Sequence, residues 1–134
     1  MSEATQLEGF KELDSALKKL PGFVAQKLLD KATRSGATVV RREARKIVLK
    51  KTGNVRKNIG VRRKRGSRIP TSVTYSIGWL SDGFYGRFLE LGTRYVPAKP
   101  HLRPAFEANK REIMEKIRFI LWRGILRETK KYLK

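Results

Sequence analysis

The fold of this chain is constrained most by a stripe of small and apolar residues between positions 23 and 49. The stripe repeats every three or four residues and comprises Val24, Leu28, Ala32, Gly36, Val40, Ala44 and Ile47. This spacing predicts a long helix with one apolar face. Because most of these side chains are small, a neighbouring backbone can approach the helix closely. We therefore expect the helix to lie flat against a sheet or a partner helix.

The opposite face of the same helix is basic. Its cations, at spacings that place them on one side, are Lys27, Lys31, Arg34, Arg41 and Arg45. Like charges four residues apart destabilise an isolated helix, and Asp30 and Glu43 offset only part of that repulsion. A basic stripe kept at helical spacing therefore indicates a contact surface.

A second basic segment follows as a loop at about residues 61–69. Its cations, arranged around a Gly-Ser pair, are Arg62, Arg63, Lys64, Arg65 and Arg68. Nothing in this segment can fill a core, so it is predicted to be a hairpin tip or a flexible loop. The formal net charge of +20 over 134 residues indicates a polyanionic partner, either nucleic acid or an acidic protein surface. A solvated basic face is the alternative interpretation.

The remaining elements are predicted from hydrophobic periodicity and from helix-ending residues. Residues 7–20 and 84–91 are predicted to be helices, the first ended by Pro21 and the second capped by Gly92. Residues 71–79 alternate apolar and polar side chains, which predicts a strand with one buried face. Its antiparallel partner is expected to begin near Val61. The last helix is predicted to start at Pro104 and to run to about residue 133.

The last helix carries two apolar rows, one of which contains Phe119 and Trp122. A helix that is apolar on two faces is usually packed on two sides, and we expect a neighbouring subunit to cover the second side. Together the elements predict an α+β fold, in which a small antiparallel sheet packs with a long helix of the N-terminal half and a long C-terminal helix. A chain of this length is expected to form a single domain, residues 1–134.

A proline-rich arm is predicted at about residues 94–104. Pro97, Pro100 and Pro104 fix the backbone and remove hydrogen-bond donors, so the segment is expected to be extended and stiff. A stiff arm could reach a neighbouring subunit at low entropic cost. The arm contains the only histidine, His101, which we interpret as structural.

The sequence offers little material for catalysis. Cysteine is absent, there is one histidine, and the 12 acidic residues form no metal-ligand pattern. Glu90, inside an apolar helix, is predicted to form an ion pair with Arg87 or Arg94. No glycine pattern matches a nucleotide-binding loop. We therefore expect no catalytic residue, no metal site, no cofactor and no enzymatic activity.

Membrane and secretory segments are not expected either. No apolar stretch approaches the roughly 20 residues of a transmembrane helix, and the N-terminus lacks a basic region followed by an apolar run. No zinc finger, KH loop or convincing helix-turn-helix is visible, so any contact with nucleic acid is expected to involve only its backbone. A sequence-independent nucleic-acid-binding protein is the alternative function.

Several segments occur in an order that resembles a known family. They are GFKEL and ALKKLP at 9–21, GATVVRREAR at 36–45, TGNVRKNIGV at 52–61, YGRFLELGT at 85–93 and PAKPHLRPAFE at 97–107. Over about residues 8–125 the chain resembles the siphophage tail-component family, whose members are called tail-completion or neck proteins. The resemblance implies a structural α+β subunit without catalytic residues. It also implies a hexameric ring between the head connector and the tail tube, through which the genome passes.

The resemblance further implies a location in the neck or tail of the virion, after assembly in the host cytoplasm. The expected partners are copies of the same chain and the adjacent head-connector and tail-tube proteins. The ten basic residues named above are candidate contacts either to double-stranded DNA in the lumen or to an acidic partner. The candidate assembly residues are Tyr85, Phe88, Leu91, Pro97, Pro100, Leu102, Pro104, Phe119 and Trp122.

Overall fold

The computed structural model describes residues 3–48, 53–64, 72–80, 83 and 85–132. Within them the helices are α1 (Glu3–Lys18), α2 (Gly22–Ile47), α3 (Gly53–Asn58), α4 (Gly86–Leu91), α5 (Leu102–Ala108) and α6 (Lys110–Tyr132), and the strands are β1 (Ile59–Arg63) and β2 (Tyr75–Trp79). The predicted α+β fold is confirmed, because a small antiparallel sheet accompanies two long helices.

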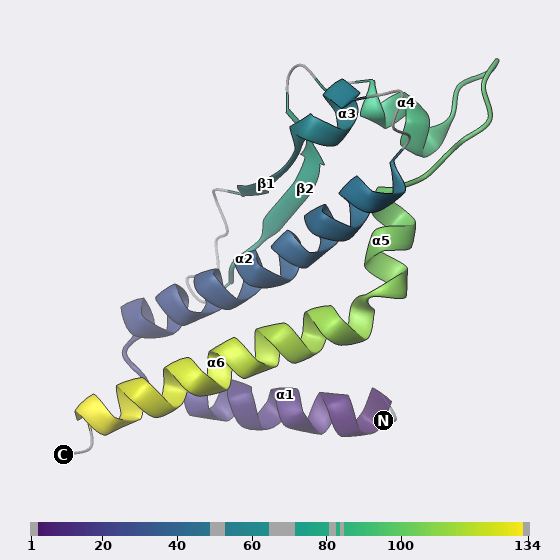
Figure 1. Ribbon diagram of the computed structural model, residues 1–134. Coiled ribbons are helices and arrows are strands. Elements are labelled where there is room, and N and C mark those ends of the chain that lie inside the picture. Colours follow the sequence, from purple (N-terminus) through teal and green to yellow (C-terminus); the bar gives the residue numbers. More distant parts are fainter. Residues whose placement is uncertain (1–2, 49–52, 65–71, 81–82, 84, 133–134) are drawn as a thin grey trace.

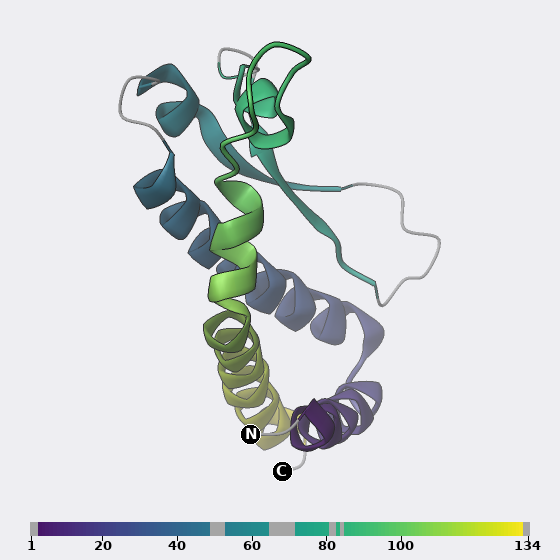
Figure 2. The ribbon, with the colours of Figure 1, turned by 90° about the vertical axis from the view of Figure 1, so that its right-hand side faces the viewer.

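Helix α2 is the centre of the fold, since it contacts α6, α5 and both strands. Figures 1 and 2 show the hairpin of β1 and β2 on one side of α2, with α6 and then α1 on the other. The predicted apolar stripe faces these neighbours. Six of its seven residues are buried, and only Ile47, in the last turn, is 44% exposed.

The two long helices meet at a pair of glycines. A Cβ atom on Gly36 of α2 would lie 2.8 Å from Ile117 Cδ1, and one on Gly124 of α6 would lie 2.3 Å from Leu28 Cδ2. Each glycine therefore accommodates a large side chain of the opposite helix. We call these four residues the seam. The close approach expected from the small residues of α2 is confirmed.

The core has two parts that follow one another along α2. The first joins α1, α2 and α6 and contains Leu13, Leu17, Val24, Leu28, Leu121 and Ile125. The second joins α2 to α3, β1, α5 and the start of α6 and contains Val39, Val40, Val55, Ile59, Ala105 and Ile113. Each part is lined by aliphatic side chains, so the stability of the helical body comes from apolar burial.

The hairpin is held on α2 by apolar side chains, by Arg45 and by Asp30, which accepts a hydrogen bond from the Tyr75 hydroxyl at 2.6 Å. Its strands pair antiparallel with Val61 opposite Ile77, as expected from the alternation in the sequence. Ile77 and Trp79 pack against the second part of the core. The guanidinium of Arg45 donates to the carbonyl oxygen of Ile59 at 3.1 Å, which ties α2 to the first strand.

The prediction of one continuous last helix from Pro104 was wrong. Helix α5 begins at Leu102, so Pro104 occupies the third position, where a missing N–H costs little because the first turn has no intrahelical acceptors. The helix is then interrupted at Asn109, whose φ of −117° and ψ of 15° are not helical, and α6 begins at the next residue. Its side-chain amide donates to the carbonyl of Ala105 at 2.9 Å.

The second apolar side of α6 is covered in part by the chain itself. Helix α1 lies along α6, and Trp122 packs against the core that they share. The expectation that a neighbouring subunit covers this whole side was therefore wrong at Trp122. Phe119 remains 64% exposed and Leu126 58% exposed.

Candidate functional site

Helix α4 leads into a projecting segment, residues 93–100, which from here on we call the arm. The predicted arm of residues 94–104 was too long, because residues 102–104 already belong to helix α5. The helix ends at Leu91 because Gly92 has a φ of 75°, and the N–H of Gly92 donates to the carbonyl of Phe88. A Cβ on Gly92 would also lie 2.8 Å from the backbone nitrogen of Ala98. Glycine is therefore required here twice, by conformation and by space, and the predicted helix cap is confirmed.

The arm is closed by its own hydrogen bonds. The hydroxyl oxygen of Thr93 accepts from the N–H groups of Tyr95 and Val96, at 3.3 and 3.0 Å. The N–H of Thr93 donates to the carbonyl of Val96 at 2.9 Å, and that of Lys99 donates to the carbonyl of Leu89 at 2.7 Å. Both ends of the arm are thus fixed to α4, and Figure 1 shows the arm projecting beyond the helices.

Glu90, in α4, holds the start of α5 where the chain leaves the arm. Its carboxylate accepts the backbone N–H groups of His101, Leu102 and Arg103, at 2.7, 2.9 and 2.9 Å. These groups begin a helix whose preceding residue supplies no side-chain cap, so they need an acceptor from elsewhere. The predicted ion pair with Arg87 or Arg94 was therefore wrong. An acid in an apolar helix, followed by a helix start without a capping side chain, was the signal in the sequence.

His101 is almost fully buried, with 1% of its surface exposed. Its Nε2 accepts the indole N–H of Trp79 at 2.9 Å, which places the proton of the neutral ring on Nδ1. Nδ1 faces Glu90 Oε2 at 3.2 Å, outside hydrogen-bond geometry. Burial lowers the pKa of His101 by more than the facing carboxylate raises it. The histidine is therefore neutral and structural, as expected.

The Glu90 carboxyl is shifted towards its charged form. Burial raises its pKa, but the hydrogen bonds from the three backbone N–H groups and the nearby His101 together lower the pKa below its ordinary value. Gly86 completes the arrangement, since a Cβ there would lie 2.2 Å from the indole ring of Trp79. We call Trp79, Gly86, Glu90 and His101 the latch. It joins the YGRFLELGT and PHLRPAFE segments.

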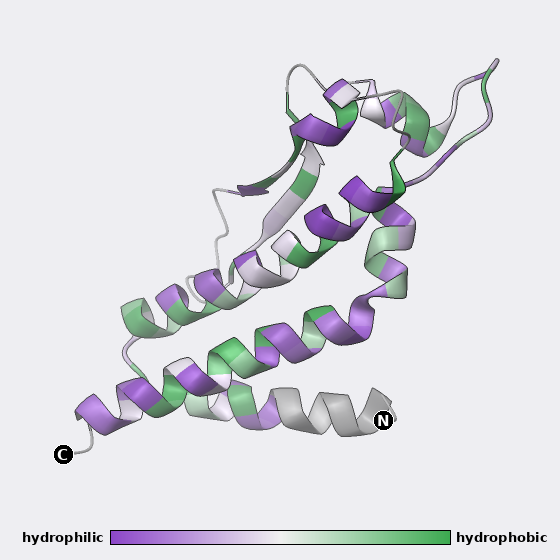
Figure 3. Ribbon diagram, in the orientation of Figure 1, coloured by the Kyte–Doolittle hydropathy of each residue, from purple (hydrophilic) through white to green (hydrophobic). Residues whose placement is uncertain are grey.

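Helix α4, the residue before it and the arm carry large apolar side chains that are open to solvent. These exposed apolar residues, which we call the platform, are Tyr85, Phe88, Leu91, Tyr95 and Val96. Leu91 is 69% exposed and Tyr95 86%, and the rings of Tyr85 and Phe88 lie 6.4 Å apart. Figure 3 shows apolar colour over much of α4 and part of the arm.

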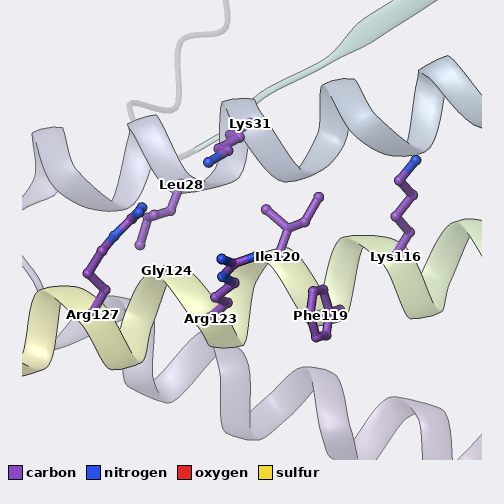
Figure 4. Close-up of a pocket in the computed structure, with 8 residues that line it drawn as sticks. All are labelled: Leu28, Lys31, Lys116, Phe119, Ile120, Arg123, Gly124 and Arg127. Atoms are coloured by element: carbon purple, nitrogen blue, oxygen red, sulfur yellow. The ribbon is translucent and has the colours of Figure 1, made fainter.

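A basic groove runs between α2 and α6, away from the platform. Its volume is about 360 Å³, and it is lined by Leu28, Lys31, Lys116, Phe119, Ile120, Arg123, Gly124 and Arg127. Figure 4 shows these side chains along the line where the two helices meet. An adjoining hollow of about 350 Å³ adds Phe23, Lys27 and Lys131, together with one acid, Glu128. The groove is therefore strongly cationic over an apolar floor.

A third hollow, of about 420 Å³, lies between α1 and α6, and its lining includes Leu20, Trp122 and Leu126. Among the described residues no group of three or more histidine, cysteine or acidic side chains could hold a metal ion. Within the same residues, no helix is long and apolar enough to cross a membrane.

Comparison with known families decides the class of this protein. Residues 11–92, more than half of the chain, match the family profile described as "Bacteriophage HK97-gp10, putative tail-component". The chain belongs to the HK97-gp10-like family. The resemblance to a tail-component family that was seen in the sequence is thereby confirmed. No curated protein and no solved structure matches the chain significantly.

Membership of the HK97-gp10-like family makes the chain a structural protein of a bacteriophage. The matched range ends at Gly92, so it contains the second half of α1, both strands and α2 to α4, but not the arm. The candidate assembly residues of this family member fall in several places. Tyr85, Phe88 and Leu91 lie on the platform, and Pro97 and Pro100 lie exposed in the arm beside it.

The other candidate assembly residues lie elsewhere. Leu102 packs against the core, and Pro104 is half-buried in α5. Phe119 is at the rim of the groove, whereas Trp122 is partly buried beside α1. The structure therefore does not gather the nine residues into one surface.

The predicted basic residues of this tail component are also divided. Lys27, Lys31 and Arg34 are exposed on α2, while Arg41 is half-buried and Arg45 turns inward to the hairpin. Arg62, Arg63 and Lys64 are exposed at the end of β1, and Arg63 pairs with Asp30 at 3.3 Å. Arg65 and Arg68 lie outside the described residues.

Sequence reasoning missed Lys116, Arg123 and Arg127, which complete the groove. Their spacing of seven and four residues places them on one face of α6, so the signal was present in the sequence. It was overlooked because the same helix is dominated by two apolar rows. Only the contact between α2 and α6 brings these cations next to Lys31.

Proposed function

We propose that this tail component is one subunit of a ring at the head–tail junction, through which the genome passes. The observation that carries the proposal is the platform, an apolar surface on a strongly charged chain. Large apolar side chains that are gathered on a short stretch of chain and left exposed favour an interaction site in soluble proteins. The chain, residues 1–134, acts as one unit in this proposal.

The latch supports a role in assembly because it fixes the direction of the platform. Glu90 and His101 are buried polar groups, and such groups cost stability unless they are paired. Here the pairing orders the arm before any partner arrives, so association does not have to pay for that ordering. A projecting arm that contacts a different surface on the next copy gives a head-to-tail interface, and such an interface forms a ring when the rotation between copies closes after a whole number of subunits.

The partners in this proposal are further copies of the chain, in a hexamer, and the head-connector and tail-tube proteins on either side. The subunit is assembled in the host cytoplasm and remains in the neck of the virion, without an enzymatic role. Double-stranded DNA in the lumen would face part of the basic surface. A sequence-independent nucleic-acid-binding protein is the second candidate, favoured by the exposed cations Lys27, Lys31 and Arg34 on α2.

The test of the ring proposal is a platform variant introduced into the phage. Leu91→Ser combined with Tyr95→Ser removes apolar surface that is already exposed, so the free energy of unfolding should change by less than about 0.5 kcal/mol. The infected cell should then accumulate filled heads and separate tails. Electron microscopy and infectious titre measure this outcome.

The control is Ile47→Ser, which removes an exposed apolar side chain from the last turn of α2, outside the platform and the groove. This variant should yield joined, infectious particles. Normal particles from the platform variant would overturn the proposed interface. Normal particles after deletion of the whole gene would overturn the proposed role at the junction.

A further inference from the structure

The groove between α2 and α6 combines two properties that a solvated basic face does not need. Its walls carry Lys31, Lys116, Arg123 and Arg127. Its floor is apolar, formed by Ile120 and by Leu28, which lies over Gly124, with Phe119 at the rim.

The groove cations also differ from others on the same helices. Arg42 pairs with Glu112 at 2.8 Å, and Arg111 pairs with Glu115 at 3.4 Å. In the described part of the chain, by contrast, none of the four groove cations has a carboxylate within 4.0 Å. Like charges gathered around an apolar floor repel one another, and an acidic ligand would relieve that repulsion.

We propose that the groove binds an acidic amphipathic helix of another virion protein. Apolar side chains at spacings of three and four residues would enter the groove, and flanking carboxylates would meet its walls. The lining extends along α6 from Lys116 to Lys131, a length of about 22 Å at 1.5 Å per residue. That length matches a partner helix of about four turns.

Duplex DNA fits the groove less well. Phosphates need only cations on an accessible surface, and a sugar–phosphate backbone has no apolar row to cover Phe119 and Ile120. A second copy of the chain is also a poor occupant, because it carries 32 basic and only 12 acidic residues. The acidic helix deepens the proposed function, since it supplies a contact to a neighbouring protein that the platform does not make.

The test uses the full chain and three fluorescent probes at two salt concentrations. The first probe is an 18-residue helical peptide with leucines at positions i, i+3, i+4 and i+7, glutamates at the positions flanking this apolar row and alanines elsewhere. The second is polyglutamate of equal net charge, and the third is a 20-base-pair DNA duplex. The amphipathic peptide is expected to bind at least about tenfold more tightly than polyglutamate, because only the peptide covers the apolar floor.

Two variants locate the binding in the groove. Arg123→Ala with Arg127→Ala is expected to weaken peptide binding about tenfold. The matched control, Arg62→Ala with Arg87→Ala, removes the same charge from β1 and α4 and should change affinity less than about twofold. Phe119→Ser should weaken peptide binding about fivefold without changing its salt dependence, since it removes apolar area and no charge.

Three results would overturn the inference. Polyglutamate could bind as tightly as the peptide, or the groove and control variants could lose affinity equally, and either result would show a diffuse electrostatic effect. A duplex that binds more tightly than the peptide and is weakened only by the groove variants would make the groove a nucleic-acid site. Because these measurements use the isolated chain, their failure leaves the ring proposal intact. A failed platform test likewise leaves the groove untouched.

Discussion

The seam between α2 and α6 and the region of α4 and the arm are built in opposite ways. At the seam, Gly36 and Gly124 let two helices approach, and aliphatic side chains fill the interior while charges stay outside. Around the latch, a carboxylate and an imidazole are inside, and large apolar side chains stay outside. The first arrangement is that of an ordinary folded core, where burial supplies stability. In the second arrangement, buried polar groups orient an exposed apolar surface. Such an arrangement favours the binding of a partner at that surface.

The strongest test of this contrast is the removal of Glu90. Glu90→Ala leaves three backbone N–H groups without their acceptor, and a loss of about 3 kcal/mol in the free energy of unfolding is expected. Glu90→Gln retains one acceptor oxygen and should lose about half as much. Urea denaturation followed by circular dichroism measures both. If Glu90→Ala lost less than about 0.5 kcal/mol, the latch would not hold the arm.

At the seam, the free energy of unfolding should depend on side-chain size and not on charge. Gly124→Ala places a methyl group against the buried Leu28, and overpacking of this kind costs about 2 kcal/mol. Gly22→Ala is the matched control, because nothing lies within 4 Å of a Cβ at that position. The control should change the free energy of unfolding by less than about 0.5 kcal/mol. Equal effects at the two glycines would show that helix propensity, and not the seam, is being measured.

The smallest expected effect is a dependence of stability on pH that belongs to the latch. In the unfolded chain His101 takes up a proton at its ordinary pKa of 6.5, whereas in the folded chain the pKa lies lower. Protonation of His101 therefore favours unfolding. Its contribution to the free energy of unfolding is fully present above pH 6.5 and is lost as the pH falls through the pKa of the folded chain. The contribution of Glu90, whose folded pKa is also lowered, is present above pH 4.5 and is lost on further acidification.

Because His101 is the only histidine, the upper part of this range isolates it. Urea midpoints at pH 7.5 and 5.5 should differ for the natural chain and coincide for His101→Gln. Trp79 donates to the same ring, so its fluorescence in a Trp122→Phe background reports the change locally. A midpoint shift that persists in His101→Gln would assign the effect to other groups.

The features that were predictable from the sequence are those whose cause is local. The stripe on α2 repeats within one helix, and Gly92 ends a helix at the residue where it stands. The role of Glu90 was not predictable in the same way, because its three donors lie 11 to 13 residues further on and have to be folded back to it. From its spacing alone Arg45 was predicted to belong to a basic surface. In the fold its guanidinium instead points to the carbonyl oxygen of Ile59 in β1, which the sequence does not reveal. The groove needs cations from two helices that are distant in the chain.

The seam also has a consequence for how the protein is made. Gly36 leaves the ribosome roughly 80 residues before Ile117, the side chain that fills the space above it. At the usual rates of translation this interval lasts roughly 4 to 16 s. During this interval the cationic helix α2 has been synthesised, whereas its main apolar partner, α6, has not. The two long helices can therefore pack together only after α6 has been synthesised, and a chain truncated before α6 would expose the apolar face of a cationic helix.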